Sequence, residues 1–225
     1  MDVQSVMLSP KVEASAIYYK TKLACHNFTI YNLANDQVVC YFWHEGEGGL
    51  TANVFASCLT DYLEGIVEDN TEEIIIYSDG CGYQNRNVLL SNTLLHFAVN
   101  HKITVTQCYL EKGHTEMEVD SAHSVIERKI RKRPIYSPSN YVEVMASACE
   151  TNPYKVKYVD HSFFKDFGTL KYYDTNRPGY KVGDPVVRNI RSLKYTKDGV
   201  IHFKTSYTDE YNEIPKKRKC YKICP

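Results

Sequence analysis

Three aspartates in this 225-residue sequence occupy positions from which an acidic metal site could be assembled. Asp79 directly follows an apolar run at 74–77, and Asp120 lies early in a segment with helical spacing. Asp2 lies in the first strand candidate. Carboxylate oxygens are ligands that suit Mg²⁺ and Mn²⁺. Two such ions about 4 Å apart activate water and stabilise the leaving oxygen in phosphodiester chemistry. The three carboxylates therefore predict a Mg²⁺ or Mn²⁺ site.

Each aspartate taken alone also fits an ordinary role. An Asp followed by Gly80 is common in turns, and Asp120 could be a surface charge on a helix. Ligand sites nevertheless gather at the carboxyl ends of strands in α/β sheets, which is where Asp79 is expected. His123, Glu127 and Arg131 follow Asp120 at steps of three and four residues, so they share its side of a helix.

A dense basic run ends the same helical segment. It consists of Arg128, Lys129, Arg131, Lys132 and Arg133. Such cations neutralise phosphates and supply affinity for nucleic acid without reading its sequence. They also suit a helix C-terminus, which is the structural alternative. We expect a DNA partner, with RNA as the alternative.

The formal net charge of zero conceals two oppositely charged halves. Residues 1–126 carry 6 Lys and Arg against 16 Asp and Glu, a net of −10. Residues 127–225 carry 21 against 11, a net of +10. The basic half indicates a polyanion partner, or else the two halves attract each other. Neutrality is thus no argument against nucleic acid.

Further basic residues lie near the end of the chain. Lys216, Lys217, Arg218 and Lys219 resemble a compact nuclear import signal, or form a solvated tail that touches phosphate. We expect a nuclear or cytoplasmic protein, with the nucleus favoured. Tyrosines next to lysines at 171–173 and 194–195 could stack on unpaired bases or pack in the core. No run of about 18 apolar residues exists, so we expect no membrane span.

The elements that would position these residues begin with three strand candidates, at 1–8, 27–33 and 37–43, the last two joined by a turn at Asn35-Asp36. A helix follows Thr51, a candidate N-cap. The run 74–77 suits a strand buried on both faces. The second helix is expected at 88–99 and another strand at 103–110. Thr115 and Glu118 have capping-box form and predict a helix to about Arg133, before Pro134.

The order of elements is therefore βββαβαβα, an α/β fold with a mixed sheet flanked by helices. Beyond Pro153 short aromatic strands alternate with turns such as Pro178-Gly179 and Asp198-Gly199. We expect one domain at 1–150 and a basic, β-rich C-terminal module at 151–225. The eight cysteines form no CxxC pair, and we expect them to be reduced.

This order, with these acidic positions, resembles the RNase H-like fold of integrases and cut-and-paste transposases. More closely, the chain is similar to a family of uncharacterised, transposon-derived animal proteins. The matching pieces are Asp2-Val3-Gln4, Pro10-Lys11, Tyr18-Tyr19-Lys20, Leu23, Asn27-Phe28, Trp43-His44-Glu45, Asp79-Gly80-Cys81, Gln84-Asn85-Arg86-Asn87, Gly113-His114-Thr115 and Asp120 to His123.

The resemblance implies functions for several residues. Asp2, Asp79 and Asp120 become the candidate metal-binding and catalytic triad, with His123 and His114 assisting as proton donors or phosphate contacts. Gln84 and Asn85 become candidate nucleic-acid contacts. The implied activity is divalent-metal-dependent cleavage or strand transfer on DNA. The alternative is a catalytically inactive, domesticated remnant that binds nucleic acid or protein.

Overall fold

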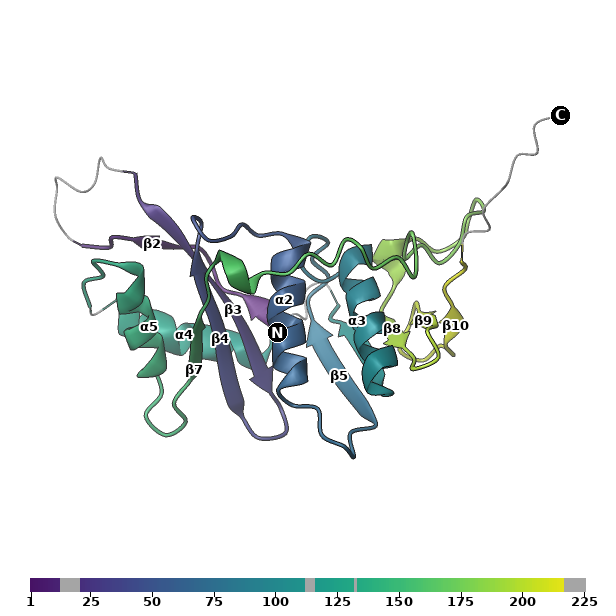
Figure 1. The fold of residues 1–225 in the computed structure, drawn as a ribbon, viewed down its shortest axis with the longest axis horizontal. Coiled ribbons are helices and arrows are strands. Elements are labelled where there is room, and N and C mark those ends of the chain that lie inside the picture. Colours follow the sequence, from purple (N-terminus) through teal and green to yellow (C-terminus); the bar gives the residue numbers. More distant parts are fainter. Residues whose placement is uncertain (13–20, 112–115, 132, 217–225) are drawn as a thin grey trace. The chain divides into compact units, whose positions relative to one another are not determined.

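The computed structural model describes residues 1–12, 21–111, 116–131 and 133–216 (Figure 1). The chain divides into two compact units, each built from two separate stretches of sequence. Unit 1 comprises residues 1–58 and 114–165, and unit 2 comprises residues 59–113 and 166–225. We expected one domain at residues 1–150 and a module at 151–225. That these two parts fold separately stays a prediction.

The sheet of unit 1 is built around one long hairpin. Strands β3 (Leu23–Asn32) and β4 (Gln37–His44) pair antiparallel from Cys25 opposite His44 to Asn32 opposite Gln37. Asp36 in the connecting turn has φ 58°, a left-handed conformation that Asp tolerates, so the predicted hairpin is confirmed. Strands β1 (Asp2–Val3) and β2 (Met7–Ser9) both pair antiparallel with β3. Strand β7 (Lys155–Tyr158) pairs parallel with β4.

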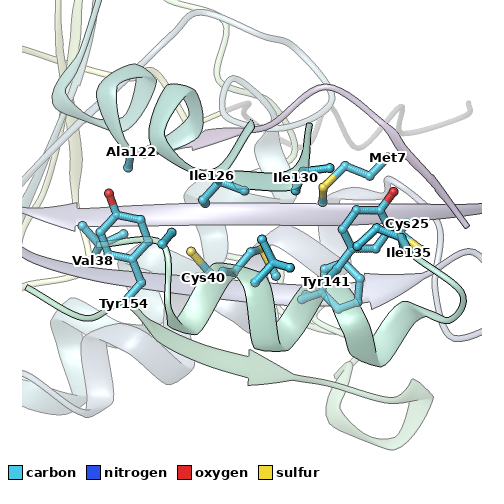
Figure 2. Close-up of a cluster of buried hydrophobic side chains, with 14 residues drawn as sticks. Met7, Cys25, Val38, Cys40, Ala122, Ile126, Ile130, Ile135, Tyr141 and Tyr154 are labelled. Atoms are coloured by element: carbon cyan, nitrogen blue, oxygen red, sulfur yellow. The ribbon is translucent and has the colours of Figure 1, made fainter. Parts of the chain in front are cut away.

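Two helices pack on this sheet, and the hydrophobic core of unit 1 is formed by side chains of the helices and the strands. Helices α4 (Glu118–Ile130) and α5 (Pro138–Ala146) pack against β3, β4 and β7. Figure 2 shows the resulting cluster, with Ala122, Ile126 and Ile130 lined up along α4. Val119 is buried with them, so these four residues form the apolar face of the helix. Helix α5 was not among the expected elements; its first residue is a proline preceded by Ser137.

The sheet of unit 2 mixes parallel and antiparallel strands. Strands β5 (Glu73–Ser78) and β6 (Thr104–Tyr109) are parallel neighbours. Strand β8 (Ser192–Tyr195) pairs antiparallel with β6, and the sheet continues through β9 (Ile201–Lys204) and β10 (Asn212–Glu213). The C-terminal residues are therefore rich in short strands, as expected, and those strands complete sheets begun earlier in the chain.

The remaining helices follow the predicted spacing closely. Helix α2 (Ala52–Glu64) begins directly after Thr51, whose carbonyl accepts the first helical hydrogen bonds. Helix α3 (Val88–His101) packs against β6 and β8 within unit 2. Short 3₁₀ turns occur at η1 (His161–Phe163) and η2 (Val187–Asn189). Within the described residues, no helix is both long enough and apolar enough to cross a membrane.

The prediction that residues 74–77 are buried on both faces is wrong. Ile76 is buried, but Ile75 is 52% exposed and Tyr77 is 42% exposed. Successive side chains of a strand point to opposite faces, and only the face that carries Ile76 is covered. Strand β5 is therefore a half-exposed strand at the end of its sheet.

Candidate functional site

Asp79 lies in the loop that leaves β5 and leads into α3. Its Oδ1 atom accepts hydrogen bonds from the Asn85 side-chain amide at 2.7 Å and from the Cys81 backbone N–H at 3.2 Å. Asn87 closes the loop as the N-cap of α3, with its Oδ1 accepting from the Leu90 N–H at 2.8 Å. The half-buried Asp79 carboxylate is thus held at the carboxyl end of a strand by the loop itself.

Gln84 and Asn85, the predicted nucleic-acid contacts in this loop, are 2% and 0% exposed. The Asn85 carbonyl accepts from the Gln107 side-chain amide at 3.0 Å and from the Tyr109 hydroxyl at 3.1 Å. Asn85 therefore has a structural task, since it joins Asp79 to a buried polar network. A direct contact of either residue with nucleic acid stays a prediction.

Arg86 is a charged residue of this loop for which no separate role was predicted. Its guanidinium carbon lies 4.3 Å from the centre of the Tyr109 ring, and its Nη1 donates to the Arg188 carbonyl at 2.8 Å. Burial lowers the pKa of this guanidinium below its ordinary value, although Arg stays charged at neutral pH. Asp79 acts in the opposite direction and favours the charged form. The only sequence signal was its place in the motif Gln84–Asn87.

Asp120 lies in unit 1, in the first turn of α4. Its Oδ2 accepts a hydrogen bond from the backbone N–H of Met117 at 2.8 Å. The helix begins at Glu118, so the predicted capping box of Thr115 with Glu118 is wrong, and Thr115 itself lies outside the described residues. Asp120 takes the capping role because its side chain reaches back across the first turn.

His123 is one turn further along α4 and is 7% exposed. Burial lowers its pKa to about 4, against the opposing effect of Asp120 and Glu127. Its Nε2 is buried and has no hydrogen-bond partner among the described residues. The lowered pKa favours the neutral imidazole at neutral pH, and assistance by His123 in catalysis stays a prediction. His114 lies outside the described residues.

A chain of buried polar side chains connects α4 to the sheet. The Gln4 amide nitrogen lies 3.4 Å from both the His123 carbonyl and Glu127 Oε1. The Gln4 oxygen accepts from Asn27 at 3.0 Å, and Asn27 also donates to the Thr29 hydroxyl at 3.1 Å. Asp2 lies on β1 opposite Thr29, partly buried.

The three aspartates of the predicted metal site are divided between the units. Asp2 and Asp120 belong to unit 1, and Asp79 belongs to unit 2. Across the described ranges, no group of three or more His, Cys, Asp or Glu side chains is arranged to hold a metal ion. Assembly of the triad around Mg²⁺ or Mn²⁺ is therefore a prediction about how the units come together.

The basic run at the end of α4 divides between two pockets. Arg128, Lys129 and Arg133 line a pocket of about 440 Å³ together with Val125 and Ala148. Lys129 forms an ion pair with the exposed Glu150 at 3.6 Å. Arg131 lines a different pocket, and Lys132 lies outside the described residues.

The second basic run is described only at its first residue. The Lys216 ammonium lies 5.2 Å from the centre of the Tyr173 ring. Lys217, Arg218 and Lys219 lie outside the described residues. Of the tyrosines beside lysines, Tyr173 and Tyr195 are buried, so for these two the alternative of core packing holds.

Comparison with known proteins gives one family. The model described as "Domain of unknown function (DUF7869)" matches residues 18–172, which is more than half of the chain. No curated protein matches the chain. No solved structure matches it either.

Proposed function

The chain belongs to the DUF7869 family, and we propose that it binds the phosphate backbone of nucleic acid through one side of α4. The surface concerned, the α4 basic side, consists of Arg128, Lys129 and Arg133 around their shared pocket. That these three cations converge on one concave surface is the observation that carries the proposal. DNA is the expected partner, and RNA is the alternative.

The electrostatics of the α4 basic side suit a polyanion. Its one ion pair among the described residues, Lys129 with Glu150, involves a carboxylate that is 88% exposed. Exposed pairs of this kind contribute only about 0–1 kcal/mol, so a phosphate can replace the glutamate at little cost. Arg and Lys contacts to phosphate release counterions and make binding strongly salt-dependent.

A salt titration of duplex binding tests this proposal. Fluorescence anisotropy of a labelled DNA duplex would compare the wild type with R128Q/K129Q/R133Q. The slope of log affinity against log salt should shrink by roughly 2–3, because each lost phosphate contact removes about 0.9 from it. The control K155Q/K165Q/K197Q removes three exposed cations elsewhere and should leave most of the slope in place. Equal slopes for the two triple variants would contradict the proposal.

A second candidate function is metal-dependent cleavage or strand transfer by an RNase H-like, transposase-derived protein. The position of Asp79 favours it, since a half-buried carboxylate follows a strand that is parallel to its neighbour. In this proposal Asp2, Asp79 and Asp120 hold Mg²⁺ or Mn²⁺. The catalytically inactive remnant is the competing form of the same proposal.

A nicking assay on supercoiled DNA with Mn²⁺ separates these two forms. Wild type would be compared with D79N, D120N and the control D174N, which changes an exposed aspartate outside the candidate triad. Activity that is lost in D79N and D120N but kept in D174N supports catalysis. Equal activity in all four proteins would mean that the triad is not the active site. Duplex binding without nicking in the wild type supports the remnant.

Nuclear import through Lys216, Lys217, Arg218 and Lys219 remains part of the proposal. A fluorescent fusion carrying these four residues as Ala should lose nuclear enrichment that the unchanged fusion displays. The same distribution for both would contradict import by this run.

A further inference from the structure

A second pocket lies on the other side of α4, within unit 1. It has a volume of about 410 Å³ and is lined by Gln4–Leu8, Lys11, Lys22, Tyr141 and, from the end of α4, Glu127, Ile130 and Arg131. Glu127, Ile130 and Arg131 line this pocket, whereas Arg128, Lys129 and Arg133 line the other, and the two pockets share no lining residue. This pocket is therefore distinct from the α4 basic side, and its volume falls within the range of small-molecule sites.

Three cations surround this pocket. Lys11, Lys22 and Arg131 come from three different segments, and Glu127 is the one acidic lining residue. No ion pair joins any of the three cations to a carboxylate within the described ranges. The pocket consequently carries an excess of positive charge that a bound anion would neutralise.

The backbones that carry two of these cations are fixed. Lys11 exchanges backbone hydrogen bonds with Ile135 in both directions, at 2.7 and 2.9 Å. Arg131 is the C-cap of α4, and its N–H donates to the Glu127 carbonyl at 3.0 Å. Because the backbone positions are set before binding, ordering costs on binding are reduced to those of the side chains.

The floor of the pocket is apolar. Met7, Ile130 and Tyr141 are buried members of the unit 1 core, and Figure 2 shows Met7 and Ile130 side by side at one end of it. The Tyr141 hydroxyl donates to the Leu8 carbonyl at 2.8 Å, which fixes the ring. Val6 and Leu8 add exposed apolar surface. The floor is suited to a flat, apolar ring system.

One buried polar group completes the site. The Gln4 side chain is buried, and its amide nitrogen makes only long contacts of 3.4 Å to the His123 carbonyl and Glu127 Oε1. Contacts of this length are weak hydrogen bonds. A ligand with ring nitrogens or hydroxyls could therefore gain hydrogen bonds from Gln4 and Glu127 that the protein itself makes poorly.

We propose that this pocket binds a nucleotide, with its phosphate among Lys11, Lys22 and Arg131 and its base over Met7, Ile130 and Tyr141. A fatty acid fits less well, since the apolar floor is short and Gln4 and Ser5 are polar. The same chemistry is offered by a free mononucleotide and by the phosphorylated end of a strand. The inference is independent of duplex binding by the α4 basic side, because it uses none of the same residues.

Calorimetric titration tests the proposal with four probes: AMP, adenosine, inorganic phosphate and a 5′-phosphorylated trinucleotide. AMP should bind more tightly than adenosine and phosphate, because it alone engages both the cations and the floor. The variant K11Q/R131Q should weaken AMP binding about tenfold or more, which corresponds to roughly 1.4 kcal/mol. The control R133Q, in the lining of the other pocket, should change it less than twofold.

The outcomes separate the possible ligands. Tighter binding of the trinucleotide than of AMP identifies a strand end, and the reverse identifies a free nucleotide. Equal affinity for AMP and inorganic phosphate would mean that the floor takes no part and would overturn the proposal. So would no saturable AMP binding in the millimolar range, or equal binding by K11Q/R131Q and R133Q. Loss of duplex binding in R128Q/K129Q/R133Q with AMP binding intact separates this site from the proposed function.

Discussion

The Asp120 carboxylate caps α4 by accepting a hydrogen bond from the Met117 N–H at 2.8 Å. This contact gives a candidate catalytic residue a structural task that can be measured by itself. It also fixes the direction of the carboxylate, because one of its oxygens is bound to the backbone at the helix start.

The first prediction concerns this cap. Asp120→Ala should lower the free energy of unfolding by about 1 kcal/mol, the usual cost of losing a cap, as measured by urea denaturation. Asp120→Asn keeps an acceptor oxygen and loses only the charge, so it should cost less. Ser124→Ala, at an exposed position of the same helix, serves as the control. Wild-type stability in Asp120→Ala would show that the cap contributes nothing.

The second prediction is a pH dependence caused by His123. An unfolded His titrates near pH 6.5, whereas the pKa of buried His123 is lowered to about 4. The unfolded state therefore binds the extra proton between these values, and stability falls as the pH drops through this window. The full effect is at most about 3 kcal/mol, from 1.36 kcal/mol per pKa unit.

The measurement is urea unfolding at pH values from 7 to 4 for the wild type and His123→Gln. The variant should lose most of the slope in this window. A smaller slope should remain from His26, whose pKa burial also lowers. Ser124→Ala, at an exposed position of the same helix, is the control and should keep the wild-type slope. An unchanged slope in His123→Gln would place the titrating group elsewhere.

The third prediction concerns the packing of Arg86 against the Asp79 loop. A Cβ atom at Gly80 would lie 2.9 Å from Arg86 Nη2 and 3.2 Å from its Cζ. Arg86 is held by Tyr109 and the Arg188 carbonyl, so it cannot move without losing contacts. Gly80→Ala should therefore destabilise the protein by about 1 kcal/mol, as in other overpacked sites.

Gly82 provides the matched control two residues away. A Cβ atom there would meet nothing within 4 Å, so Gly82→Ala should be neutral or stabilise the fold by up to about 1 kcal/mol through the unfolded chain. Equal melting temperatures for the two variants would show that Arg86 is not held in this position.

The fourth prediction tests the buried network beneath the loop. The Tyr195 hydroxyl donates to Gln107 Oε1 at 2.9 Å and lies 3.1 Å from Ser91 Oγ. Tyr195→Phe should cost about 1 kcal/mol, since a buried hydrogen bond is lost and its partners are left less satisfied. Tyr136→Phe, at a position that is 70% exposed, is the control and should change stability by less than about 0.5 kcal/mol. Comparable losses for both tyrosines would contradict the burial of this network.

The spacing of apolar residues predicted most of the helices and strands, because these elements depend on residues that are close together in sequence. The apolar face from Val119 to Ile130 and the turn at Asn35-Asp36 depend on residues close in sequence. Burial of residues 74–77 depends instead on what covers each face of the sheet. Nothing in an apolar run states whether both faces are covered, so the exposure of Ile75 and Tyr77 could not be predicted.

For the candidate sites, the residue types could be predicted from the sequence, but their arrangement in space could not. The basic run was found from composition, but its division between two pockets depends on which segments pack beside the end of α4. Lys11, Lys22 and Gln4 come from segments distant from Arg131 in sequence. Their convergence on one pocket depends on the pairing of β2 with β3, which no local pattern encodes.

The interleaved order of the two units determines how the protein can be dissected. A fragment that ends at residue 150 would lack β7 from the sheet of unit 1 and β8, β9 and β10 from the sheet of unit 2. The newly uncovered edges of β4 and β6 would expose unpaired backbone groups, and such edges promote aggregation. Activity lost by such a fragment would therefore report on two damaged sheets. Point substitutions are therefore better suited than fragments to finding the function of each unit.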